Sequence, residues 1–155
     1  MLTIILILLF GWFVSGVVHE LGHAIIGKMA RLNIEYFQLI PHGVSFSGKT
    51  SDSWFAAISI AGPIFPVLIG IVGVLTAILF KEKYPYVSYS LWVFIPMMMQ
   101  SFILLCAPIA RAFGVNESNG DITKFLELAK WHPLAVSLVG LVLVACCVVV
   151  LKMAI

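Results

Sequence analysis

Two histidines with a glutamate between them, His19, Glu20 and His23, are the residues best suited to chemistry in this sequence. Histidines at positions i and i+4 lie on one face of a helix and can direct two ring nitrogens at one tetrahedral Zn²⁺, while the glutamate can take a proton from a water molecule there. The motif lies in an apolar stretch, where an ionisable residue costs at least ~2.5–3.5 kcal/mol by insertion scales. We therefore predict a metal site, with a structural polar cluster as the alternative.

The two histidines need a partner, because a catalytic zinc typically takes three protein ligands. Asp121 is our candidate, since it follows a glycine, comes just before a predicted helix, and belongs to a segment expected on the same side of the membrane as the motif. Helix capping explains an aspartate at this position equally well. The other candidates are Glu117, Glu127, His42, His132, Asp52 and Glu35.

The composition is that of a membrane protein. Hydrophobic residues make up 62% of the 155 residues and charged residues 10%, against roughly 45–50% and 25% in soluble domains. Four apolar stretches are each long enough to cross a hydrocarbon core of ~30 Å. We predict one domain, 1–155, of all-α multi-pass class, with about four transmembrane helices at about 2–30, 54–80, 87–109 and 133–152.

Between the first two helices, residues of about 34–50 have a strand-like pattern. Ile34–Leu39 is rich in aromatic and β-branched residues, Val44 and Phe46 alternate with serines, and Pro41–Gly43 lies between them as a turn. This pattern predicts a short membrane-associated β-hairpin. An irregular loop on the membrane surface is the alternative.

Residues of about 111–130 are more polar and are expected to form a loop and a short helix. Phe125, Leu126 and Ala129 recur on one helical face, and Asp121 stands where it can cap the amino end. The second apolar stretch contains Ala61-Gly62-Pro63, which is explained either by the wall of a water-filled cavity or by ordinary helix packing.

The net charge of +2 comes from scattered basic residues, so no patch dense enough to bind nucleic acid exists in the sequence. Basic residues at alternate ends of four crossings are distributed unequally. The positive-inside tendency then predicts a cell-membrane protein with its site toward the cytoplasm and both termini outside. The richer side carries Lys28, Arg31, Lys49, Arg111, Lys124 and Lys130, and the other side carries Lys81, Lys83 and Lys152.

Four features follow one another along the chain: H-E-L-G-H at His19–His23, a strand-like insertion, the Ala61-Gly62-Pro63 start of a second helix, and a later aspartate. Together they resemble the site-2 protease family of intramembrane zinc metalloproteases. The resemblance runs from about residue 10 to residue 130. In that family the aspartate is usually followed by glycine, after a stretch with Asn and Pro. Here the order is Gly120-Asp121, and the spacing leaves open whether Asn116 or Asn119 contacts substrate.

The resemblance implies hydrolysis of a peptide bond within or near a transmembrane segment of another membrane protein, as in regulated intramembrane proteolysis. It implies one Zn²⁺ per chain held by His19, His23 and Asp121, with Glu20 as general base and then acid. The substrate segment has to unwind, and the predicted hairpin can take it as an added strand. The expected partners are the transmembrane substrate, the lipid bilayer and regulatory membrane proteins.

Two other classes share part of this pattern. A zinc-binding membrane protein without proteolysis, such as a transporter or an inactive protease-like chaperone, would have the histidines but no need of Glu20. A transporter would also be expected to contain internal repeats, and we find none in the sequence. A structural subunit, whose polar cluster joins helices, would contain no stoichiometric zinc.

Overall fold

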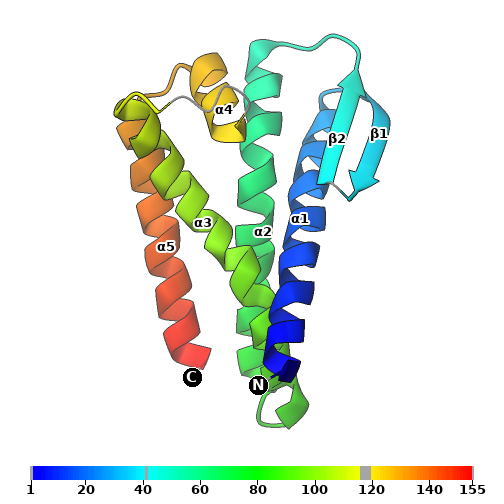
Figure 1. Ribbon diagram of the computed structural model, residues 1–155, viewed down its shortest axis with the longest axis vertical. Coiled ribbons are helices and arrows are strands. Elements are labelled where there is room, and N and C mark those ends of the chain that lie inside the picture. The colour runs from blue at the N-terminus through cyan, green and yellow to red at the C-terminus, as the bar shows by residue number, and fades with distance from the viewer. Residues whose placement is uncertain (1, 41, 116–119, 155) are drawn as a thin grey trace.

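Four long helices and a two-stranded hairpin make up most of the chain (Figure 1). The computed structural model describes residues 2–40, 42–115 and 120–154. The expected fold class is confirmed, because the hairpin lies between the first and second of these helices. The elements are α1 (Leu2–Met29), β1 (Asn33–Leu39), β2 (His42–Ser47), α2 (Asp52–Phe80), the 3-10 helix η1 (Pro85–Ser90), α3 (Leu91–Ala112), α4 (Asp121–Ala129) and α5 (Pro133–Ala154).

Within the described residues, four helical stretches are long and apolar enough to cross a membrane: Leu2–Met29, Asp52–Phe80, Val87–Ala112 and Pro133–Ala154. The third begins as η1 and continues as α3, so the helix expected at 87–109 is divided by a change of helical type. Pro85 fits the start of η1 because proline lacks a backbone N–H, and the N–H of a residue at that position would have no helical partner. Both termini lie at one end of the bundle, and α4 lies at the other (Figure 1).

Close backbone contact joins α1 to α2. A Cβ added to Gly22 would lie 2.6 Å from the carbonyl oxygen of Ala61, so only glycine allows the two helices to approach this closely. Small residues at helix crossings are the usual means of packing in lipid, where burial of apolar side chains gives little driving force. Since Gly22 belongs to the H-E-L-G-H motif, the crossing brings that motif directly against α2.

The hairpin is antiparallel, with an irregularity in the register between Ile34 and Tyr36. It packs on α1 through β2, where two rings lie over glycines. The ring of Phe46 occupies the space that a side chain at Gly27 would need, and the ring of His42 does the same at Gly16. The two contacts hold β2 alongside the part of α1 that carries the histidines.

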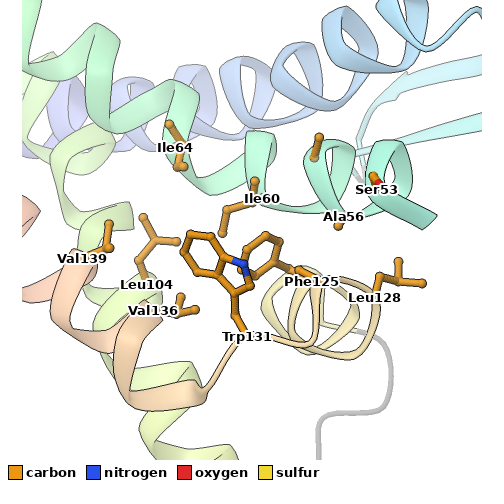
Figure 2. Close-up of a pocket in the computed structure, with 12 residues that line it drawn as sticks. Ser53, Ala56, Ile60, Ile64, Leu104, Phe125, Leu128, Trp131, Val136 and Val139 are labelled. Atoms are coloured by element: carbon orange, nitrogen blue, oxygen red, sulfur yellow. The ribbon is translucent and has the colours of Figure 1, made fainter. Parts of the chain in front are cut away.

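Helix α4 is amphipathic and packs its apolar face on α2. Ile122, Phe125 and Leu126 are buried in a cluster with residues of α2, α3 and α5. On the same side, an apolar pocket of about 570 Å³ opens between these elements, and the ring of Trp131 meets that of Phe125 edge to face inside it (Figure 2). The pocket is lined by Ser53, Ala56, Ala57, Ile60, Ile64, Leu104, Phe125, Leu128, Ala129, Trp131, Val136 and Val139.

Candidate metal centre

Side chains from α1 and α4 meet although they are about a hundred positions apart in the sequence. The Nε2 atom of His19 lies 2.9 Å from Oδ2 of Asp121, and Nε2 of His23 lies 3.4 Å from the same oxygen. Tetrahedral zinc with bonds of about 2.0–2.1 Å places its ligand atoms about 3.3 Å apart. The two distances to Asp121 are close to the spacing of zinc ligand atoms, so these side chains are candidate ligands.

The orientation of His23 suits a metal ligand. Its Nδ1–H donates a hydrogen bond of 2.7 Å to the carbonyl oxygen of Ile58 on α2, and the ring is buried. A neutral imidazole protonated at Nδ1 has a lone pair at Nε2, and here that lone pair faces a carboxylate oxygen of Asp121. Two lone pairs in this arrangement repel unless a proton or a metal ion lies between them. A backbone carbonyl that holds the distal N–H is the usual support for a histidine bound to metal.

Asp121 does not cap α4, so the capping explanation considered for it is wrong. The N-cap residue is Gly120, no side-chain cap hydrogen bond is present there, and the Asp121 carboxylate faces α1 instead. Burial raises the pKa of this carboxyl group, but hydrogen bonds and charge from His19 and His23 lower it further than burial raises it. The net effect keeps the pKa of Asp121 below its ordinary value, so the group is an anion and can bind a cation.

Glu20 lies beside the histidines. One carboxylate oxygen of Glu20 and one ring nitrogen each of His19 and His23 are within 4.8 Å of one another. A pocket of about 300 Å³ adjoins this group, and Glu20, His23 and Asp121 all line it. The carboxylate is therefore placed to exchange protons with a molecule in the pocket. The remaining lining residues are Gly43, Val44, Phe46, Phe55, Ile58, Ser59 and Lys124.

Gly62 of α2 lies directly against both imidazoles. A Cβ at this position would be 2.6 Å from Nε2 of His19 and would also overlap the ring of His23. Pro63 and Pro66 follow within α2 and cannot donate helical hydrogen bonds, so the carbonyl oxygens of Ser59 and Gly62 lose their i+4 partners. The sequence explains Ala61-Gly62-Pro63 either as a cavity wall or as a packing contact, and the structure places Gly62 next to the candidate ligand atoms.

The other acidic and histidine candidates that the structure describes lie in other contacts. Glu127 pairs with Arg111 at 3.0 Å, and Glu35 accepts a hydrogen bond from Ser45. The remaining three are His42, which packs on α1 near Phe13, His132, whose Nδ1 accepts a bond from the Leu134 N–H, and Asp52, which is exposed at the start of α2. Glu117, Asn116 and Asn119 lie outside the described residues.

The larger pocket of Figure 2 is separate from these donors. Its lining is apolar apart from Ser53, and Glu20, His23 and Asp121 do not contribute to it. Helix α4 lies between the two pockets, because Asp121 lines the smaller one and Phe125 lines the larger one. Hydrolytic chemistry needs proton-transferring and metal-binding groups, so the smaller pocket is the candidate active site.

Comparison with known proteins supports the family expected from the sequence. The family described as Peptidase M50B-like matches residues 2–115, which is more than half of the chain. A zinc metalloprotease of Methanocaldococcus jannaschii is 43% identical over 61 residues, a stretch that covers 39% of this chain and 18% of that relative. No solved structure matches the chain. The resemblance to the site-2 proteases is confirmed, and the chain belongs to the Peptidase M50B-like family of zinc metalloproteases.

Proposed function

We propose that this chain is an intramembrane zinc endopeptidase that hydrolyses a peptide bond within or near a transmembrane segment of another membrane protein. The observation that carries the proposal is the convergence of His19, His23 and Asp121 near Glu20. These residues adjoin a pocket that helices long enough to span a membrane help to form. Residues 1–155 act as one membrane-embedded domain in this proposal.

His19, His23 and Asp121 would hold one zinc ion per chain, because two imidazole nitrogens and a carboxylate oxygen are the donors of a catalytic site that keeps one position open. Zinc bound there supplies Lewis acidity, which polarises a carbonyl group and lowers the pKa of water. The Ile58 carbonyl keeps the His23 ring in place, and Gly62 leaves room for both rings.

Glu20 is the proposed general base and general acid. Its carboxylate accepts a proton from the attacking water while the oxygen bonds to the scissile carbonyl carbon, and it then gives that proton to the leaving amine nitrogen as the C–N bond breaks. The position of Glu20 beside both histidines and in the pocket supports this role. A zinc protein that only stored or carried the metal would gain nothing from this carboxylate.

Strand β2 is the proposed docking element for an unwound substrate. Gly43, Val44 and Phe46 of β2 line the same pocket as Glu20 and His23. In the described hairpin β2 pairs with β1 along one edge, so its other edge is available to an added strand. Main-chain hydrogen bonds made there would hold a segment extended, which exposes a carbonyl group that an intact helix keeps bonded.

The proposed location is the cell membrane, with the site toward the cytoplasm and both termini outside. The excess of basic residues at one end of the predicted crossings supports this orientation. Regulatory membrane proteins are proposed as further partners.

Comparison of membrane proteins in cells that carry the native chain or Glu20→Gln tests the proposal. The amide cannot accept the proton, so uncut substrates should accumulate and their fragments should disappear. Glu127→Gln is a matched control, because Glu127 pairs with Arg111 on the surface of α4 and does not line the pocket. An identical set of fragments in all three strains would contradict the proposed protease.

A further inference from the structure

One lysine borders the candidate active site. Among the residues that line the pocket of about 300 Å³, Lys124 is the one lysine or arginine that the structure describes there. It lies three positions after Asp121 on α4, and residues at i and i+3 of a helix have Cβ atoms about 5–6 Å apart on one face. Lys124 is exposed and also lines the pocket, so a group that enters the pocket can contact its side chain.

No acidic residue in the described part of the chain forms an ion pair with Lys124. The ion pairs within the described part of the chain join Asp121 to the two histidines and Glu127 to Arg111. Glu127, which is three positions further along α4, is thus already paired with Arg111 at 3.0 Å. The ammonium group is left available for a carboxylate that enters with the substrate.

We propose that Lys124 is a specificity-determining residue that selects substrates with an aspartate or glutamate about two positions from the scissile bond. This inference rests on the proposed function. An extended chain advances about 3.3 Å per residue, so a side chain two positions away lies about 7 Å along the strand. The Cβ atoms of Asp121 and Lys124 are about 5–6 Å apart on the α4 face, and the long lysine side chain extends further, so its ammonium group can reach a side chain about 7 Å along the strand.

The rest of the lining makes charge the discriminating property. Val44, Phe46 and Phe55 offer apolar contact that accepts many side chains, whereas the single ammonium group attracts an acid and repels a base. Charge complementarity contributes to specificity mainly by excluding the wrong partner. A basic residue at the same position of the substrate would face Lys124 without a compensating acid.

A reciprocal charge exchange tests the inference. The probes are three synthetic transmembrane peptides in lipid vesicles, each with a glycine-rich centre and identical except for Asp, Asn or Lys two positions from the bond that is cut. Native protein should cleave the Asp peptide with kcat/KM about tenfold above that for the Lys peptide. Lys124→Glu should reverse the order, and the Asn peptide should change least. Lys130→Glu, at the C-cap that follows the same helix and outside the pocket lining, should keep the native order.

Binding of the same peptides to the Glu20→Gln form, with and without Lys124→Glu, gives a measurement independent of turnover. The Asp peptide should bind more tightly than the Lys peptide when Lys124 is present, and the preference should reverse with the substitution. Equal binding of all three peptides to both forms would overturn the selection by Lys124. If the native protein cleaves no peptide while the binding preference follows Lys124, the proposed proteolysis fails and the selection stands.

Discussion

Gly62→Ala is the substitution for which the structure gives the most definite expectation. The new methyl group would lie 2.6 Å from Nε2 of His19 and would overlap the ring of His23, whereas ordinary contacts begin near 3.4 Å. At least one imidazole has to retreat by about 0.8 Å. The His23 ring cannot do so freely, because its Nδ1–H bond to the Ile58 carbonyl would be stretched.

The size of the effect follows from the tolerance of metal geometry. Ligand distances in zinc sites hold to about ±0.2 Å, so a shift of about 0.8 Å at a ligand nitrogen exceeds what the site can absorb. Disturbing the support of a metal-bound histidine typically costs about 10–100-fold in affinity. We expect Gly62→Ala to weaken zinc binding by at least tenfold, which is about 1.4 kcal/mol or more.

The assay is titration of metal-free purified protein with Zn²⁺ against a competing chelating dye. Gly43→Ala is one control, since the nearest atom to its new methyl group would be Cε2 of Tyr36 at 4.0 Å. Gly140→Ala is the second, because its methyl group would lie 2.7 Å from the carbonyl oxygen of Leu104, away from the histidines. Gly43→Ala should bind zinc like the native protein, and Gly140→Ala should lose thermal stability with unchanged zinc affinity.

The reasoning would be refuted by native zinc affinity in Gly62→Ala when Gly140→Ala is destabilised as expected. That pair of results would show that added methyl groups do disturb the helix crossings while the ring nitrogens beside Gly62 play no part in metal binding.

Two further predictions concern the third ligand and the docking strand. Asp121→Ala should lower zinc content and abolish activity, because it removes the oxygen that both histidines face. Glu127→Ala should keep both zinc and activity, as measured by metal analysis and cleavage of a membrane substrate. The reverse pattern would assign the ligand role to Glu127. Ser45→Pro should lower the cleavage rate strongly while zinc content stays normal, because proline removes a main-chain donor from β2. Val44→Ala should lower the rate only slightly, because it leaves the main-chain donors in place. An unchanged rate in Ser45→Pro would show that β2 does not dock the substrate.

Local features of the structure were predictable from the sequence. The histidines and Glu20 share one turn of α1, so their spacing alone indicates what they can do together. The alternation of Val44 and Phe46 with serines likewise predicted a strand, which is β2. Both patterns depend only on the repeat of the local backbone, and that repeat can be read from neighbouring residues.

Features that depend on helix crossings were not predictable in the same way. Asp121 reaches His19 from 102 positions away, and its sequence neighbourhood suits a helix cap equally well. The Ile58 carbonyl is a backbone group without a signature in the sequence, and Gly62 becomes important only because α1 lies against α2 there. In the sequence Lys124 is one of several scattered basic residues, because the pocket beside it exists only in the folded chain.

The most direct test of zinc-dependent proteolysis is the cleavage rate of purified protein in lipid vesicles, freed of metal by a chelator and then titrated with Zn²⁺. If His19, His23 and Asp121 form a single site, cleavage of a transmembrane substrate should be absent without zinc, rise with added metal and level off at about one ion per chain. Glu20→Gln should bind the same amount of zinc and remain inactive at every concentration. Cleavage that persists without metal, or that survives in Glu20→Gln, would contradict the account.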